Sequence, residues 1–191
     1  MKELKMDRKK RYTRMVLQDS LIELMREKPI NKITIKELCE NADVNRSTFY
    51  AHFSDQYELL NTIEEETLSW AKVAFESVIG SASDEAETIK GLEGICQYIA
   101  DNSKHLQILM SEQGDIGFQK QLFTLVYNLL GINLQADQNG DGDSKELSLI
   151  FVVNGCVGLI QHWLKTGLRQ SPQEIALIIF KMTTPTFKYL N

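Results

Sequence analysis

The chain has 191 residues, of which 43% are hydrophobic and 25% are charged, the proportions of an ordinary soluble globular protein. It contains only three prolines, and strand-like alternation is nowhere sustained, so we expect an all-α fold. The charged N-terminus has no apolar core behind it, which argues against a signal peptide and favours a cytoplasmic location. The three cysteines lie far apart and match no CxxC or Cys/His ligand spacing, so we expect no disulfide framework, metal site or cofactor; they are Cys39, Cys96 and Cys156.

Charge is distributed unevenly along the chain, although the net value of −5 at first argues against a nucleic-acid partner. Residues 1–61 hold 12 Lys and Arg against 10 Asp and Glu and carry +2, whereas residues 62–191 carry −7. The basic excess is sharpest in the run Arg8-Lys9-Lys10-Arg11. Such a run is either a solvated N-terminus or an arm that binds phosphates. The asymmetry predicts a small DNA-reading head on a larger body.

The first two helices have clear start and stop signals. Apolar residues at helical spacing predict a first helix over residues 12–28, which Pro29 ends. Thr34 and Glu37 have the spacing of a capping box, in which each side chain satisfies the other residue's backbone N–H. We therefore expect a second helix from Thr34 to Ala42.

A short turn separates the second helix from a third. Asp43-Val44 forms this turn, and Asn45 is a good N-cap for the helix that follows. Phe49 and Phe53, four residues apart, anchor that helix to a core. A long fourth helix is expected over residues 56–79, capped by the Ser or Asp that precedes it. Helix, short turn and helix together are the arrangement that places one helix in the major groove of DNA.

The third helix carries side chains suited to DNA on the faces that the two phenylalanines leave open. Arg can read guanine bidentately from the major groove, and Ser, Thr, Tyr and His suit phosphate oxygens. A helix that merely faced water would more often carry Glu, Lys and Gln. The residues in question are Arg46, Ser47, Thr48, Tyr50 and His52.

The sequence resembles the DNA-binding domain of the TetR/AcrR repressors over residues 33–38 and 42–53 and at Leu59-Leu60. The most specific part of this resemblance is the Thr-Phe-Tyr-x-His-Phe sequence at 48–53. The resemblance covers about a quarter of the chain. It implies about nine helices, with a DNA-binding head over residues 1–55. It also implies a helical regulatory and dimerisation body over residues 56–191.

The resemblance also implies roles for individual residues. Positions expected to touch phosphates, or to lie beside them, are Thr34, Ser47, Thr48, Tyr50 and His52. Positions expected to reach base edges are Lys36, Asn45 and Arg46.

Two positions depart from the family pattern. Asp43 stands where the family usually has Gly, and Asp tolerates a left-handed backbone better than most residues. Gln56 stands where the family usually has a phosphate-contacting Lys. Gln still offers a hydrogen bond but no charge, so DNA affinity should be weaker and less dependent on salt.

The body is expected to contain helices over residues 89–100, 104–111 and 118–134, after a polar loop over residues 81–87. The resemblance lets some aromatic residues of this region line a pocket for a small apolar inducer. Apolar side chains at helical spacing are, however, more often plain core. The candidate pocket residues are Trp70, Tyr98, Phe118 and Tyr127.

Residues 137–143 match the first half of a calcium-binding loop, but its twelfth position holds Ser148 instead of the bidentate Glu that calcium requires. We therefore expect this Asn-, Asp- and Gly-rich segment to be a connecting loop.

The last two helices are expected to form a two-fold dimer interface. Residues 147–164 are apolar on several faces, and their polar interruptions favour a buried helix over a membrane span. Ser171 and Glu174 form a second capping box, and Thr183-Thr184-Pro185 is expected to close the final helix. The expected interface residues are Gly155, Gly158, Leu159, Trp163, Ile175, Ile178, Ile179 and Met182.

The sequence supports three classes of function to different degrees. The first is a dimeric repressor that binds a pseudo-palindromic operator in double-stranded DNA and is released by a small-molecule inducer. The second is a protein–protein adaptor or coactivator of the same fold with weak DNA binding, favoured by Gln56 and the acidic body. The third is an enzyme, which lacks support because there is no nucleophile elbow, phosphate-binding glycine loop or metal constellation.

Overall fold

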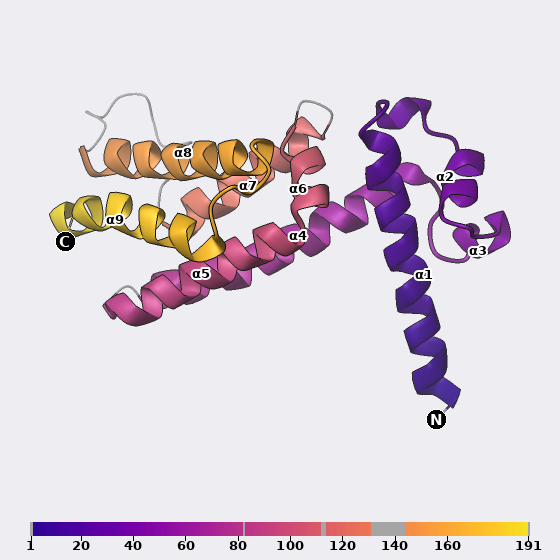
Figure 1. Ribbon diagram of the computed structural model, residues 1–191, viewed down its shortest axis with the longest axis horizontal. Coiled ribbons are helices and arrows are strands. Elements are labelled where there is room, and N and C mark those ends of the chain that lie inside the picture. The colour runs from indigo at the N-terminus through magenta and orange to yellow at the C-terminus, as the bar shows by residue number, and fades with distance from the viewer. Residues whose placement is uncertain (1, 82, 112–113, 131–143, 191) are drawn as a thin grey trace.

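The computed structural model describes residues 2–81, 83–111, 114–130 and 144–190, and in this part of the chain it contains helices and no strand (Figure 1). Of the described residues, 81% are helical, which confirms the expected all-α class. Its helices are, in chain order, α1 (Lys2–Met25), α2 (Ile35–Asn41), α3 (Arg46–Tyr50), α4 (Gln56–Gly80), α5 (Glu85–Asp101), α6 (Ser103–Leu109), α7 (Ile116–Leu129), α8 (Ser144–Lys165) and α9 (Pro172–Leu190), with a 3-10 turn, η1 (Ile30–Lys32), between α1 and α2.

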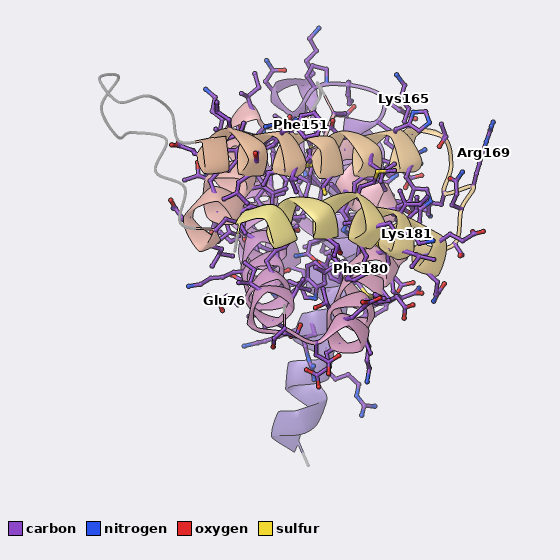
Figure 2. All side chains as sticks on the ribbon, turned by 90° about the vertical axis from the view of Figure 1, so that its left-hand side faces the viewer. Glu76, Phe151, Lys165, Arg169, Phe180 and Lys181 are labelled. Atoms are coloured by element: carbon purple, nitrogen blue, oxygen red, sulfur yellow. The ribbon has the colours of Figure 1, made fainter. Side chains whose placement is uncertain are left out.

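The helices form a small head and a larger body, joined by one long helix. α1, α2 and α3 lie together at one end of the molecule, and α4 runs from this head along the body (Figure 1). α5 packs on α4 and along α9, while α8 packs on α7 and α9. The last two helices run side by side across the end of the body that is far from the head (Figure 2).

One hydrophobic core holds the head together and continues into the body. From the body, Ile108 and Leu109 of α6 and Phe118 of α7 belong to it. Each fully buried side chain of this size contributes about 1.5–3 kcal/mol, so the corner between α6 and α7 supports the head. The head side of this core includes Leu17, Leu21, Leu38, Phe49, Phe53, Leu59 and Ile63.

A second core lies between α5, α8 and α9. Its largest side chain is Trp163, whose indole N–H donates to the Gln170 carbonyl at 2.9 Å. This core corrects part of the expected dimer interface. Three of the residues assigned there from sequence are buried inside the protomer, where a partner cannot reach them: Trp163, Ile175 and Ile179.

Two helices begin at other residues than the sequence predicts. α1 begins at Lys2, ten residues before the predicted start. The polar loop predicted over residues 81–87 is shorter, because Asp84 accepts hydrogen bonds from the backbone N–H groups of Ala86 and Glu87 and so starts α5 at Glu85. The segment over residues 137–143 and the end of the predicted helix 118–134 lie outside the described residues.

α9 does not stop where the sequence predicts. The helix continues through Pro185 to Leu190, so the expected closure at Thr183-Thr184-Pro185 is wrong. A proline removes one backbone hydrogen bond from a helix without forbidding the turns that follow. The hydroxyl of Thr184 donates to the Phe180 carbonyl at 2.7 Å just before this point, and packing against α5 and α8 holds α9 in place.

α8 is buried on one side rather than on several. Leu149 and Val153 face the protomer core, whereas Leu147 and Phe151 are exposed. By length and composition alone, the segment Glu146–Lys165 is apolar enough to cross a membrane. Its mean hydropathy is 1.6, and 28% of it is buried inside the protein. A helix that packs on a core with one face passes the same test, so this single helix is weak support for a membrane span.

Candidate nucleic-acid interface

The start of α2 is fixed by the predicted capping box. The Glu37 backbone N–H donates to the Thr34 hydroxyl oxygen at 3.2 Å, and the Thr34 backbone N–H donates to Glu37 Oε2 at 3.0 Å. Lys28 Nζ lies 2.6 Å from Glu37 Oε1 and ties the end of the first helical segment to the box. The Lys28 hydrogen bond, followed by those from Thr34, lowers the Glu37 pKa to about 2. The Thr34 hydroxyl also donates to Glu37 Oε2 at 2.9 Å, so its hydrogen is already engaged within the protein.

The turn between α2 and α3 has the left-handed residue that the sequence predicts. Asp43 has φ 50°, a conformation that Asp and Asn tolerate better than most residues. The Val44 backbone N–H donates to the Cys39 carbonyl at 2.9 Å and closes the turn. This geometry sets the direction in which α3 leaves α2.

α3 is short and is anchored by its two phenylalanines. Phe49 and Phe53 are buried in the head core, with ring centroids 5.9 Å apart. Tyr50 lies edge-on to Phe49 yet is 58% exposed. Asn45 has the extended backbone of an N-cap, but its side chain makes no capping hydrogen bond. Since that amide is not used to cap α3, it is left for an external partner.

The residues predicted to reach base edges lie in one place. Lys36, Asn45 and Arg46 all line an open groove of about 430 Å³ between α2 and α3. The side chains of all three are exposed. The same groove contains Glu40, which lies 3.8 Å from Lys36 Nζ, and Asp43. These two carboxylates reduce the positive potential that the groove offers to phosphates, which sequence reasoning did not anticipate.

The residues predicted to contact phosphates do not line this groove. Ser47 and Tyr50 are exposed, whereas Thr48, His52 and Gln56 are half-buried. Burial lowers the His52 pKa, and the positive charges of Arg14 and Lys10 lower it further. His52 is therefore a neutral hydrogen-bonding group at neutral pH.

Gln56 opens α4 in an acidic setting. The Asp55 carboxylate accepts hydrogen bonds from the backbone N–H groups of Tyr57 and Glu58, both at 2.8 Å. The Ser54 backbone N–H donates to the Glu58 carboxylate at 2.6 Å. Hydrogen bonding from the Ser54 side chain, followed by that from its backbone, lowers the Glu58 pKa. Two carboxylates thus already occupy the helix terminus where the family pattern expects a cation beside a phosphate, so the lost charge at Gln56 is not replaced locally.

Arg14 of α1 was not assigned a site role from the sequence, and it packs against the end of the recognition unit. Its guanidinium lies over the Phe53 ring, 5.9 Å from the centroid, and pairs with Glu66 of α4 at 2.7 Å. Gln18 also donates to Glu66, at 2.9 Å. These contacts fix α1 to α4 beside the residues that follow α3.

The four aromatic residues proposed for an inducer pocket do not meet in one cavity. Trp70 and Tyr98 stack on each other, with centroids 3.4 Å apart. Phe118 is buried in the head core, and Tyr127 packs with α8 in a third cluster, where its hydroxyl accepts a hydrogen bond from Asn154 at 2.9 Å. The open groove of about 490 Å³ between α4 and α7 contains none of them. Their burial supports the plain-core interpretation for Phe118 and Tyr127.

The far end of the body presents an apolar surface on α8 and α9. Gly155, Gly158, Ile178 and Met182 are exposed there, and Leu159 is half-buried. A side chain built at either glycine would meet nothing within 4 Å in the protomer, so the fold of the protomer does not require them. Sequence reasoning missed Phe151, which is 79% exposed and faces outward on α8 (Figure 2). It was not distinguished from the buried residues of α8 because exposure depends on packing partners distant in sequence.

A capped helix, a tight turn and an exposed, phenylalanine-anchored second helix define a helix-turn-helix DNA-binding protein. The family model described as "Bacterial regulatory proteins, tetR family" matches residues 19–63, and that described as "Transcriptional regulator C-terminal region" matches residues 87–185. The second match covers more than half of the chain. The chain belongs to the TetR family of transcriptional regulators.

Individual relatives agree with this assignment. The HTH-type transcriptional regulator YxbF of Bacillus subtilis (strain 168) is 26% identical over 179 residues, which cover 92% of this chain and 45% of that protein. The chain thus spans about half the length of this curated relative. A TetR transcriptional regulator from Streptococcus agalactiae 2603V has a TM-score of 0.56 at 19% identity, over 94% of this chain and 98% of that one. NalD of Pseudomonas aeruginosa, a secondary repressor of a multidrug efflux pump, has a TM-score of 0.51 at 18% identity, over 94% and 96%. At these identities the solved structures show a shared fold.

Proposed function

We propose that the protein is a cytoplasmic dimeric repressor that binds a pseudo-palindromic operator through α3. The observation that carries this proposal is the groove between α2 and α3, where Lys36, Asn45 and Arg46 converge with exposed side chains. Arg46 is the residue best suited to read guanine. In a two-fold dimer the two α3 helices would lie about 34–36 Å apart, in successive major grooves.

The exposed surface of α8 and α9 supports the dimer. Large exposed apolar side chains that gather on neighbouring helices mark interaction surfaces, and two-fold dimers are the commonest oligomers. We assign the interface to Gly155, Gly158, Leu159, Ile178 and Met182, and we add Phe151.

The shared core supports regulation by a ligand bound in the body. Ile108, Leu109 and Phe118 belong to the same core as the head, so a shift of α6 or α7 would reach α1 and α4. A small apolar inducer that binds one arrangement of the body more tightly than the other would change the separation of the two heads. We propose residues 1–55 and 56–191 as the units that carry these two tasks.

Two substitutions test the DNA site. Arg46→Ala should relax sequence preference, whereas Tyr50→Phe should weaken binding to all sequences alike, because the first residue is proposed to read bases and the second a phosphate. Binding is measured by fluorescence anisotropy on duplexes from the region upstream of the gene and on mixed-sequence duplexes. Lys120→Ala, on the exposed surface of α7, is the control and should bind like the wild type. Unchanged affinity and preference in Arg46→Ala would remove this residue from the site.

An adaptor or coactivator is the second candidate, and a specific observation favours it. The DNA-facing side of the head includes Glu40 and Asp43 in the groove and Asp55 and Glu58 beside Gln56. A solved structure of the same fold, the dihydroxyacetone kinase operon activator DhaS, has a TM-score of 0.54 at 18% identity over 93% of this chain and 97% of that one. The fold therefore serves activators as well as repressors. Absence of salt-dependent binding to any duplex would favour the adaptor.

A further inference from the structure

The N-terminal half of α1 stands clear of the rest of the protein. It projects beyond the head, with no other helix beside it in either view (Figures 1 and 2). Among the described side chains, Thr13 is the first buried residue of α1, and Leu17 is the first that enters the head core. Ahead of Thr13, the side chains of Arg8, Lys9 and Lys10 are all exposed.

The first turns of α1 concentrate positive charge. Residues 2–14 contain seven Lys and Arg against two acidic residues, on a chain whose net charge is −5. The side chains of Arg8, Lys9 and Lys10 are exposed, and no hydrogen bond or ion pair in the described part of the chain engages them. The segment thus carries about +5 while the remainder of the chain carries about −10.

The basic segment begins beside the end of the recognition helix. Arg14 lies over the ring of Phe53, which follows α3 by three residues. Lys10 precedes Arg14 by one helical turn and shares its face of α1. The positive charges of Lys10 and Arg14 both lower the pKa of His52, which agrees with their closeness to this end of the head. From here the cations continue away from the head along α1.

We propose that the basic segment of α1 is a second DNA-contacting surface, which binds duplex phosphates outside the groove that α3 occupies. This inference rests on the proposed function. The residues before Tyr12 extend α1 by about 15 Å, a length that faces several consecutive phosphates, which follow one another about every 1.7 Å of duplex axis. Contacts of this kind are independent of sequence and offset the charge lost at Gln56.

Duplex DNA fits this surface better than an anionic membrane or a partner helix. Arg8, Lys9, Lys10 and Arg11 are consecutive, so at 100° per residue their side chains leave the helix on all sides. A helix that binds a membrane surface needs a wide apolar face, and so does a helix that packs in a protein groove. The run of cations has no such face, and the phosphates of the duplex need none.

The test compares two variants of the full-length protein that have the same net charge. Arg8→Gln/Lys9→Gln/Lys10→Gln removes three cations from the basic segment, and Lys72→Gln/Lys90→Gln/Lys120→Gln removes three exposed cations from the body. Affinity for a fluorescein-labelled duplex of mixed sequence, several helical turns long, is measured by anisotropy over a KCl series. Circular dichroism should show both variants folded, because none of the six side chains is buried.

The expected result is that the slope of log affinity against log salt falls in magnitude by at least about 2 in the α1 variant, since each lost phosphate contact is worth about 0.9 and the dimer has two such segments. The body variant should keep the wild-type slope. Equal slopes in all three proteins would overturn the inference and leave the α3 proposal standing. Wild-type protein that binds no duplex at low salt would instead overturn the proposed function. Binding to phosphatidylserine vesicles that is lost in the α1 variant, with an unchanged DNA slope, would assign the segment to membranes.

Discussion

Glu64 of α4 is a carboxyl group buried where the head meets the body. It is 7% exposed, and its Oε1 has no hydrogen-bond partner among the described residues. Burial, followed by the negative charge of Asp115 at the start of α7, raises its pKa from the ordinary 4.5 to about 7. A buried carboxyl without a partner is costly when ionised, so the protonated form is the one that fits this site.

The first prediction concerns the pH dependence that Glu64 creates. The folded protein binds this proton more tightly than the unfolded chain does. The resulting stabilisation is therefore fully present below about pH 4.5 and is lost as the pH rises through about 7. Glu64→Gln, which is neutral at every pH, should raise the free energy of unfolding at pH 8 by about 1–3 kcal/mol. The difference should shrink as the pH falls towards 5, as measured by urea denaturation across this range.

Glu65→Gln is the matched control, because Glu65 is the exposed neighbour of Glu64 in the same helix. It should leave the dependence of stability on pH as in the wild type. If Glu64→Gln and the wild type lost stability in parallel between pH 5 and pH 8, the buried carboxyl would not be the titrating group.

At the scale of elements, the helix-turn-helix depends on a turn with one left-handed residue. Asp43 holds φ 50° between α2 and α3 and lies in the groove with Lys36 and Arg46. Its carboxylate faces the same groove in which a phosphate backbone would bind. The residue therefore affects both the backbone energy of the turn and the potential of the groove.

The second prediction separates these two effects. Asp43→Gly should stabilise the protein by about 0.5–1 kcal/mol, because glycine adopts a positive φ without strain. Asp43→Ala should destabilise it, since alanine tolerates that conformation poorly. Both variants remove the same negative charge, so both should bind duplex DNA more tightly than the wild type once folded. Thermal unfolding and anisotropy measure the two effects, and equal stability of the Gly and Ala variants would contradict the backbone argument.

At the scale of the whole molecule, the head and the body are joined by packing as well as by α4. The head core contains Ile108, Leu109 and Phe118 from α6 and α7, and His105 of α6 lies 2.8 Å from Asp19 of α1. A change in the body thus has a direct route to the DNA-binding residues. We therefore propose that the boundary near residue 55 separates two functions, DNA binding and regulation. It does not separate two hydrophobic cores, because the core of the head extends past it.

The third prediction concerns the proposed dimer. Phe151→Glu places a charge on the exposed surface of α8, where the side chain is 79% exposed in the protomer, and should yield a folded monomer. Val73→Glu is the control, because Val73 is also exposed but lies on α4. Sedimentation velocity should show a dimer for the control and the wild type, and a monomer with weakened DNA binding for Phe151→Glu. A dimeric Phe151→Glu protein would place the interface elsewhere.

Both capping boxes were predictable from sequence because their signals are local. Thr34 with Glu37, and Ser171 with Glu174, satisfy backbone groups three residues apart, so no distant contact is needed to form them. The left-handed backbone of Asp43 follows from the turn in the same way. These signals located the recognition unit and allowed the family to be identified.

Burial was less predictable, because it depends on segments far apart in the chain. Phe118 and Tyr127 both read as candidate pocket residues, yet one packs with the head and the other with α8. Proline at position 185 is a local signal to stop, yet α9, which packs against α5 and α8, continues to Leu190. The acidic surroundings of Gln56 likewise appear only when the cap of α4 is seen folded.

The sequence by itself determined the all-helical class, the helix-turn-helix and the residues that α3 presents, because hydrogen bonds and apolar periodicity within a few residues dictate them. Only the tertiary structure decided that Trp163 is core while Phe151, on the same helix, faces outward. It also brought Lys36 into one groove with Arg46 and left the start of α1 projecting beyond the head. Such outcomes depend on which distant helices pack together, and helical periodicity alone does not specify the partner of each apolar face.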